Sequence, residues 1–245
     1  MKKQRLDKFL MEQGLAKDKR EAFIVVTEGR VFVDGQKAVS PAQMISGVQK
    51  IEIRGERDFV GRGALKLDAA LKKFAIDANG LICADIGAAT GGFTEVLLKN
   101  GAKKVYAIDT ARGKLDLKLR EDPRVVVMEG MDVRDLERLS EVAELVTIDI
   151  SLISLRQILP AAKRFLKNTG SIVALFKPQY ETREPAMLRH GIIQGEENRK
   201  LLLASFKKWL SENRWEIVGE MESPIRGGKG NVEYLFYLQS KGGHL

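Results

Sequence analysis

The stretch Asp85-Ile86-Gly87-Ala88-Ala89-Thr90-Gly91-Gly92-Phe93 decides the fold of this chain. It follows the apolar run 81–84 and precedes a helical pattern that begins near Gly92, so we expect it to join a strand to a helix. Its glycines allow the backbone to approach a ligand closely, and ligands of α/β sheets bind beyond the carboxyl ends of the strands. The spacing differs from the dinucleotide pattern G-x-G-x-x-G and contains no Gly-Lys-Ser/Thr. It therefore argues against a nicotinamide or flavin oxidoreductase and against a P-loop.

Strands and helices are expected to alternate on both sides of this loop. Candidate strands lie at 81–86, 104–108, 125–128, 145–150, 171–176, 215–220 and 232–238, and candidate helices at about 64–75, 92–100, 154–167 and 196–212. Such alternation is typical of a doubly wound parallel sheet. The last two strands are joined by a glycine-rich segment with no room for a helix, so they are expected to pair antiparallel. We predict an α/β fold with six parallel strands and one antiparallel strand, the architecture of class I S-adenosylmethionine-dependent methyltransferases.

Residues 1–57 form a separate small α+β module in this interpretation, followed by a linker at 58–63 and the larger domain at 64–245. Apolar residues at helical spacing predict a first helix that stops at Gly14 and a second helix at about 18–28. The segment 30–35 alternates and ends in Asp-Gly, which indicates a strand that enters a tight turn. The segment 48–53 alternates again and predicts another strand.

The N-terminal module resembles the S4 RNA-binding domain. The residues that carry the resemblance are Arg5-Leu6-Asp7 with Leu10, Gly14-Leu15-Ala16, Ala22, and 29–35. The chain departs from the S4 pattern at Asp18-Lys19, where Ser-Arg is usual. The module has 12 Lys/Arg against 8 Asp/Glu, a net charge of +4 within a chain of +8, which favours an anionic partner. The resemblance implies RNA phosphate contacts from Arg5, Lys8, Lys17, Lys19, Arg20 and Arg30.

The remaining bulk features point to a cytoplasmic globular protein. The chain has 245 residues, of which 44% are hydrophobic and 30% charged, and this is ordinary for a soluble fold. Its one cysteine, Cys83, excludes an internal disulfide and is expected to be a buried strand residue. The N-terminus lacks the apolar region of a signal peptide, and no apolar run approaches the roughly 18–20 residues that span a bilayer. No His/Cys cluster suggests a metal.

Four residues are expected to meet beside the glycine-rich loop: Lys66, Asp149, Lys177 and Glu233. Lys66 comes from the helix before the sheet, Asp149 and Lys177 end the fourth and fifth strands, and Glu233 starts the last one. An ammonium group stabilises a developing alkoxide, and a carboxylate orients that ammonium or assists its loss of a proton. The four groups therefore favour metal-independent methylation of a ribose hydroxyl. Taken singly, each also has a structural explanation, as a solvated lysine or a strand-end acid.

The cofactor contacts are expected in the loop and at the ends of the next two strands. The candidate loop residues are Asp85, Gly87, Ala88, Gly91, Gly92 and Phe93. An acid at the start of the loop suits a cofactor with an amino-acid cation. Asp109 is placed to accept hydrogen bonds from ribose hydroxyls and Asp132 to reach the adenine amine, although turn-forming aspartates remain an alternative for both. The loop resembles the S-adenosylmethionine motif of FtsJ-like methyltransferases, which also share the order Lys-Asp-Lys-Glu.

The whole chain resembles the TlyA family, which is also labelled haemolysin A. Besides the S4 match and the loop, the resemblance is carried by the segments Arg62-Gly63-Ala64-Leu65-Lys66-Leu67, Asp149-Ile150-Ser151-Leu152-Ile153-Ser154 and Lys177-Pro178-Gln179. It implies methyl transfer from S-adenosylmethionine to the 2′-oxygen of cytidine in ribosomal RNA, either free or in a ribosomal subunit. The chain departs from the family at Met131-Asp132-Val133-Arg134, where Thr-Asn-Val-Arg is expected, and Asp retains an acceptor there.

Two alternative functions stay open at this point, as does the oligomeric state. One is an RNA-binding protein whose methyltransferase domain is inactive. The other is a membrane-active haemolysin, for which the helix near 196–212 is the best candidate segment, although that helix is more simply packed on the sheet. Other methyl acceptors fit less well. Pyrimidine C5 chemistry needs a nucleophilic cysteine, and amine methylation usually places Asp/Asn-Pro-Pro-Tyr/Phe where this chain has Asp149-Ile150-Ser151-Leu152.

Overall fold

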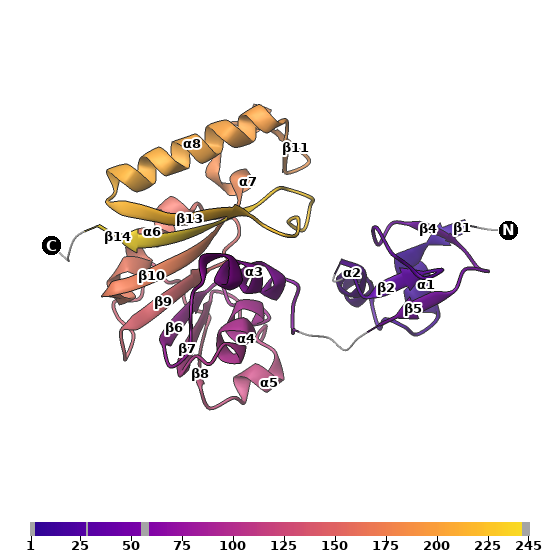
Figure 1. Cartoon of the computed structure of the whole chain (residues 1–245), viewed down its shortest axis with the longest axis horizontal. Helices are drawn as coiled ribbons and strands as arrows, with labels where there is room; N and C mark the ends of the chain where they lie inside the picture. Colours follow the sequence, from indigo (N-terminus) through magenta and orange to yellow (C-terminus); the bar gives the residue numbers. More distant parts are fainter. Residues whose placement is uncertain (1–2, 28, 55–58, 242–245) are drawn as a thin grey trace. The chain divides into compact units, whose positions relative to one another are not determined.

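The computed structural model describes residues 3–27, 29–54 and 59–241. The chain divides into two compact units, Met1–Arg62 and Gly63–Leu245, which are called the N-terminal unit and the C-terminal unit below (Figure 1). Glu28, where the second predicted helix ends, lies outside the described residues. So do residues 55–58, which include the last residues of the predicted module and the first residue of the predicted linker.

The N-terminal unit is a small α+β fold. Its elements are β1 (Lys3–Arg5), α1 (Leu6–Glu12), α2 (Lys19–Thr27), β2 (Val31–Val33), β3 (Gln36–Lys37), β4 (Met44–Ser46) and β5 (Ile51–Ile53). β1 pairs with β4, and β2 lies between β3 and β5, with all of these pairs antiparallel. Asp34 and Gly35 join β2 to β3 with φ angles of 51° and 81°, the left-handed geometry of a two-residue hairpin turn. The predicted Asp-Gly turn is present.

The C-terminal unit is built on a seven-stranded sheet. Its strands are β6 (Ile82–Ile86), β7 (Lys104–Asp109), β8 (Val125–Glu129), β9 (Ala143–Ile148), β10 (Leu166–Phe176), β13 (Trp215–Glu222) and β14 (Tyr234–Ser240). Their order in space is β13-β14-β10-β9-β6-β7-β8. β14 runs antiparallel to both β10 and β13, and the remaining pairs are parallel. The predicted six parallel strands and one antiparallel strand are confirmed, and the structure adds that the antiparallel strand lies inside the sheet.

The connecting helices match the predicted ones to within a few residues. They are α3 (Ala64–Phe74), α4 (Gly92–Lys99), α6 (Leu155–Phe165) and α8 (Glu196–Glu212). The structure also has short elements that the sequence did not predict: α5 (Leu117–Arg120), α7 (Pro178–Glu181), the 3₁₀ turn η1 (Pro185–Met187), and a hairpin of β11 (Leu188–Arg189) and β12 (Ile192–Ile193). These short elements lie in the segments that follow β7 and β10, at the carboxyl edge of the sheet.

Aromatic packing fixes α8 on the sheet. The Phe206 ring of α8 lies 4.8 Å from the ring of Phe176 on β10 and 5.3 Å from that of Phe236 on β14, and all three side chains are fully buried. This helix is therefore a covering helix of the sheet. Of the helices that the structure describes, none is long and apolar enough to cross a membrane. Cys83 is fully buried in β6, as predicted, and burial raises the pKa of its thiol to about 12.

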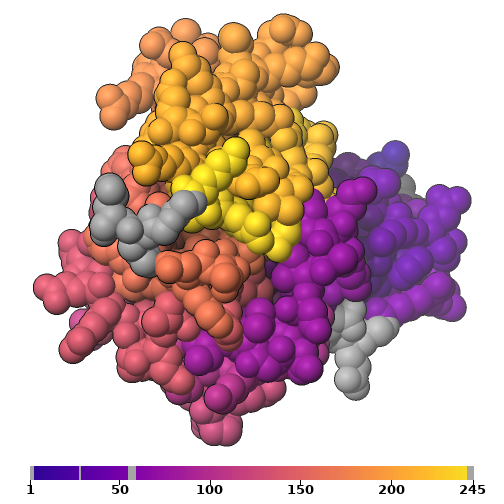
Figure 2. Space-filling model, turned by 60° about the vertical axis from the view of Figure 1, so that its left-hand side comes forward, coloured from indigo at the N-terminus to yellow at the C-terminus, as the bar shows by residue number. Residues whose placement is uncertain are grey.

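The helix before the sheet and the last strand are neighbours, although they are far apart in the sequence. Phe74, the last residue of α3, stacks on Tyr237 of β14 with ring centroids 5.7 Å apart. Figure 2 shows the C-terminal strands, in yellow, directly beside the magenta segment that contains α3. This packing brings the beginning of α3 close to the segment that leads into β14, and each of these places carries one of the predicted site residues.

Candidate active site

The first two predicted site residues form a buried ion pair. Lys66 lies in the first turn of α3, and Glu233 directly precedes β14. The Lys66 Nζ is 2.6 Å from the Glu233 Oε2, and the two residues are only 5% and 3% exposed. Since charges are costly to bury alone, the contact between these two side chains offsets part of the cost of burying each of them.

The other two predicted site residues form a second ion pair, which is more open. Asp149 follows β9 directly and Lys177 follows β10 directly, and these two strands are parallel neighbours. The Lys177 Nζ is 2.5 Å from the Asp149 Oδ1 and 3.0 Å from the Ser151 Oγ. The Asp149 side chain keeps 21% of its surface exposed. Sequence reasoning quoted Ser151 within a motif but assigned it no role. Its contact arises because the loop after β9 turns back toward Lys177.

The two ion pairs lie at the same edge of the sheet. Phe176 of β10 and Tyr234 of β14 are opposite each other in the antiparallel pairing of these strands. Lys177 follows Phe176 and Glu233 precedes Tyr234, so Lys177 and Glu233 face each other at the next position. A Cβ placed on Gly63 would lie 3.6 Å from the Asp149 Oδ2, so the start of α3 lies beside the second pair as well. The structure therefore brings the four predicted residues together at one edge of the sheet, with each lysine beside a carboxylate.

The glycine-rich loop packs against the strand end that carries Asp149. Gly87 has φ +85°, and a Cβ there would overlap the backbone of Asp149. Gly91 has φ +95°, and a Cβ there would overlap Leu115 and Leu119. Both positions thus require glycine for backbone conformation and for space. The loop leads straight into α4, which begins at Gly92.

Asp85, at the start of the glycine-rich loop, is fully buried and bonded to other side chains of the protein. Its residue exposure is 0%, and its carboxylate accepts hydrogen bonds from the hydroxyls of Thr94 at 2.7 Å and Thr147 at 3.1 Å. Burial raises the pKa of this carboxyl group to about 7, against the opposite effect of the two threonines. Both carboxylate oxygens thus have partners within the protein, and the predicted contact with an amino-acid cation stays a prediction. Phe93 is likewise buried, at 3% exposure, and packs below Gly63.

Asp109 joins the end of β7 to the glycine-rich loop. Its Oδ2 accepts a hydrogen bond of 2.8 Å from the Ala89 amide, and its Oδ1 accepts one of 2.7 Å from the Ala111 amide. The residue is half-buried. A carboxylate has lone pairs to spare beyond these two bonds. The side chain is therefore fixed in place and still able to accept further donors.

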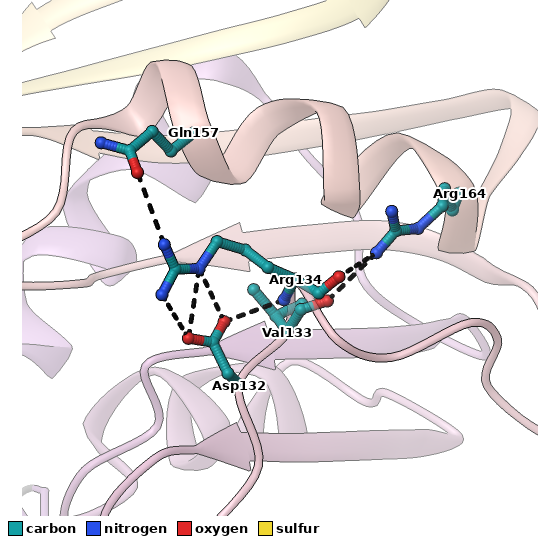
Figure 3. A network of polar contacts seen from close by, with 5 residues as sticks. All are labelled: Asp132, Val133, Arg134, Gln157 and Arg164. Carbon is teal, nitrogen blue, oxygen red and sulfur yellow. Dashed lines mark hydrogen bonds and ion pairs between the residues drawn. The ribbon is translucent and has the colours of Figure 1, made fainter.

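Asp132 is held by its neighbour Arg134. Figure 3 shows its carboxylate facing the Arg134 guanidinium, which approaches to 2.5 Å and also reaches Gln157 on α6. The Arg134 side-chain hydrogen bond, followed by its backbone amide and its charge, keeps the pKa of Asp132 below its usual range. The same figure shows Arg164 donating to backbone carbonyls of this segment. An adenine amine would have to compete with Arg134 for this carboxylate, which the sequence did not reveal.

Glu129 is an anchoring residue that sequence reasoning missed. Its carboxylate accepts hydrogen bonds from the amides of Gly113, Lys114 and Leu115 and from Arg120. These bonds lower its pKa to about 2. They fix the loop after β7, whose Leu115 packs on Gly91. A strand-end glutamate gives no sequence signal for this, because its partners are backbone amides.

The six cations predicted to bind RNA lie on the N-terminal unit. Arg5, Lys8, Lys17, Lys19 and Arg20 are exposed, and Arg30 is half-buried. Arg5 is 2.6 Å from Asp7, and Lys8 is 3.6 Å from Glu12, so part of the charge is balanced within α1. The side-chain hydrogen bond from Arg5, with a smaller electrostatic contribution from Lys19, lowers the pKa of Asp7. A cation at the end of β1 and one at the start of α2 thus both act on this acid.

Comparison with known proteins assigns the chain to a family. The FtsJ-like methyltransferase model matches residues 59–240, and the S4 domain model matches residues 4–47. The 16S/23S rRNA (cytidine-2′-O)-methyltransferase TlyA of Mycobacterium tuberculosis is 39% identical over 241 residues, which cover 97% of this chain and 90% of that protein. The chain belongs to the TlyA family. It is therefore a methyltransferase of the FtsJ-like class with an S4 domain.

Other members extend the similarity over the full chain. Hemolysin A of Brachyspira hyodysenteriae is 37% identical over 237 residues, which cover 96% of this chain and 99% of that protein. The structure of a hemolysin-like protein from Streptococcus thermophilus has a TM-score of 0.76 and 36% identity, with 98% of this chain and 90% of that chain covered. The names of these relatives thus include both a ribosomal RNA methyltransferase and a haemolysin.

Proposed function

We propose that this protein transfers the methyl group of S-adenosylmethionine to the ribose 2′-hydroxyl of a cytidine in ribosomal RNA, without a metal. The observation that supports this most is the pair of lysine–carboxylate contacts at one sheet edge, 2.6 Å for Lys66–Glu233 and 2.5 Å for Lys177–Asp149. The choice of cytidine and of ribosomal RNA in this proposal rests on the names of two related proteins, one from Mycobacterium tuberculosis and one from Campylobacter jejuni. Among the described residues, no group of three or more His, Cys, Asp or Glu side chains is arranged to hold a metal.

The chain has a donor and acceptor set that fits S-adenosylmethionine. Gly87, Ala88, Gly91 and Gly92 form a turn that requires glycine at two positions and ends in a helix N-terminus. The amides of Gly87, Ala88 and Gly91 donate to the carbonyls of Ile108 and Ala88, which holds the turn in a fixed shape beside the proposed cofactor. Asp109 offers a fixed, half-buried carboxylate for ribose hydroxyls. When bound, the cofactor supplies an electrophilic methyl carbon on a sulfonium. Asp132 is the proposed acceptor for the adenine amine. This role requires its carboxylate to bind Arg134 and the amine at the same time.

The four charged residues have separate roles in the proposed reaction. Lys177, oriented by Asp149 and Ser151, stabilises the negative charge that develops on the 2′-oxygen. Asp149 takes up the hydroxyl proton as the new O–CH₃ bond forms and the sulfur–methyl bond breaks, which leaves a neutral thioether. Lys66, held by Glu233, adds a second positive charge in the same buried setting. Positioning of the oxygen in line with the methyl carbon supplies much of the remaining rate.

RNA capture is assigned mainly to the N-terminal unit. Its exposed cations are Arg5, Lys8, Lys17, Lys19 and Arg20, joined by the half-buried Arg30, and they belong to a unit that matches the S4 domain. Ribosomal subunits or their free RNA are the proposed partners, and this substrate is met in the cytoplasm. Phosphate contacts contribute affinity without reading sequence, so the choice of nucleotide falls to the C-terminal unit.

The proposal is tested by comparing Lys177→Ala with Lys167→Ala. Both lysines belong to the β10 region and form an ion pair with an acid, but Lys167 is exposed at the opposite end of the strand, 3.1 Å from Glu144. We expect Lys177→Ala to lower methyl transfer by about 10²–10⁴-fold, since it removes the group that stabilises the developing charge. Lys167→Ala should retain the wild-type rate.

The measurement is incorporation of tritiated methyl groups from S-adenosylmethionine into ribosomal RNA and into purified subunits, followed by mapping of 2′-O-methyl sites. Undiminished transfer by Lys177→Ala would contradict the role of this lysine. A wild-type protein that binds RNA and transfers no methyl group to either substrate would favour the RNA-binding alternative instead.

A further inference from the structure

A buried asparagine lies two residues before Glu233 and connects the glutamate-bearing loop to another element. Asn231 is 3% exposed. Its Oδ1 accepts a hydrogen bond of 3.0 Å from the Ile193 amide of β12, and its Nδ2 donates one of 2.8 Å to the Gly191 carbonyl. Both halves of the side-chain amide are thus bonded to the β11–β12 hairpin. Buried amide groups that use donor and acceptor in this way fix one arrangement of the backbone.

The β11–β12 hairpin, to which Asn231 is hydrogen-bonded, has a regular two-residue turn. Leu188 pairs with Ile193 and Arg189 with Ile192, and the turn residues His190 and Gly191 have φ angles of 53° and 79°. These are the left-handed values of a tight two-residue turn. The Gln194 amide closes the base of the hairpin by donating to the Met187 carbonyl at 2.9 Å. Asn231 therefore bonds to a preformed support.

The loop between β13 and β14 is closed tightly around the Glu233 carboxylate. The Gly227 amide donates to the Asn231 carbonyl at 2.9 Å, and the Ser223 amide donates to the Glu233 carbonyl at 2.8 Å. A Cβ at Gly227 would lie 2.9 Å from the carboxyl carbon of Glu233 and closer still to its Oε1. The backbone of Gly227 thus packs directly on the group that holds Lys66.

We propose that Asn231 and Gly227 are positioning residues for the Lys66–Glu233 ion pair, acting through the β11–β12 hairpin and the closed loop. Asn231 anchors the loop to the hairpin, and Gly227 leaves the space in which the Glu233 carboxylate lies. The consequence for catalysis rests on the proposed function, because it assumes that Lys66 acts at the reacting oxygen. The structural coupling itself does not rest on it.

The test uses the full-length variants Asn231→Ala and Gly227→Ala. Gly227 lies outside the left-handed region, so its replacement by alanine strains no backbone angle and displaces only the Glu233 carboxylate. Asn213→Ala is the matched control, because the exposed Asn213 also donates its side-chain amide to a backbone carbonyl, that of Trp209 at 2.8 Å. The readouts are kcat and KM for methyl transfer, cofactor affinity by calorimetry, Ile193 amide exchange, and the ¹⁵N signal of the Lys66 ammonium.

We expect both variants to lower kcat by about 10- to 100-fold, as small displacements of reacting groups do, with little change in cofactor affinity. Asn231→Ala should also accelerate exchange of the Ile193 amide, and both variants should shift or broaden the Lys66 signal. Asn213→Ala should behave as wild type.

An unchanged Lys66 signal in both variants would overturn the proposal, as would a fall in cofactor affinity equal to the fall in kcat. If the wild-type protein transfers no methyl group, the proposed function fails, while amide exchange and the Lys66 signal still decide whether the hairpin positions Glu233.

Discussion

The two lysine–carboxylate pairs have the same chemistry but lie in different surroundings. Lys66 and Glu233 have side-chain exposures of 7% and 3%, whereas Lys177 and Asp149 have 10% and 21%. The second pair also has a hydroxyl partner in Ser151, 3.0 Å from the Lys177 Nζ. We therefore expect the enclosed pair to contribute more to stability and the open pair to be more accessible to a substrate. Each prediction below would break or sharpen this distinction.

The largest effect is expected for Asp149→Asn. Asparagine keeps the shape of the side chain but cannot take up a proton, so we predict a loss of about 10²–10⁴-fold in kcat. The free energy of unfolding should fall by less than it does in Glu233→Gln, because the Asp149 side chain is partly solvated. Single-turnover methyl transfer and urea unfolding are the measurements. A large loss of stability together with the activity would remove the contrast with the enclosed pair.

Glu233→Gln is expected to act first on stability. The substitution leaves the Lys66 ammonium buried without an opposite charge, and removal of one partner of a buried pair typically costs about 3–5 kcal/mol. Urea unfolding followed by tryptophan fluorescence measures this cost, because Trp209 and Trp215, the two tryptophans of the chain, both lie in the C-terminal unit. The rate of methyl transfer should also fall, since Lys66 loses the carboxylate that holds its ammonium group in place. A variant as stable as wild type would show that water reaches this pair freely.

A pH-dependent effect on stability is expected from the titration of Asp85. Its pKa is raised to about 7, chiefly by burial and also by the charge of Asp149. A carboxyl group with a raised pKa in the folded state stabilises the fold below its unfolded pKa, and this contribution is lost as the pH rises through the folded value. Stability should therefore decline between about pH 4 and pH 7, and Asp85→Asn should remove that decline.

The same titration distinguishes the two ion pairs. Asp149→Asn should lower the pH at which Asp85 loses its proton, because it removes a neighbouring negative charge, whereas Glu233→Gln should leave it unchanged. Urea midpoints measured across this pH range, with Asp85→Asn as the reference, provide the check. Equal shifts from both variants would mean that the two carboxylates are equally close to the glycine-rich loop in electrostatic terms.

Much of the architecture follows from local sequence pattern. Alternating apolar segments predicted the strands, and the glycine-rich link before β14 predicted its antiparallel direction. Strand-end position was enough to predict that Asp149 and Lys177 meet, because the carboxyl ends of parallel neighbours share one edge. The insertion of β14 between β10 and β13 was not predicted, since strand order depends on contacts between distant segments.

The roles of single acids were less predictable, because they depend on partners that a sequence does not display. Asp85 and Asp109 both lie at strand ends, yet the first is fully buried by two threonines and the second remains half-exposed. Asp132 pairs with Arg134, only two positions away, and the sequence does not show whether its carboxylate binds this neighbour or a ligand. Glu129 and Asn231 bond mainly to backbone groups, which are present everywhere along a chain and therefore leave no signature.

The position of β14 inside the sheet affects the order in which the charged cluster can form. Lys66 and Glu233 are separated by 167 positions, and Glu233 is held at the end of a strand that must enter between two others. A nascent chain that has not yet emerged beyond β13 lacks both this strand and the partner of Lys66. The charged cluster therefore forms only after β14 has been made, late in the order of the chain.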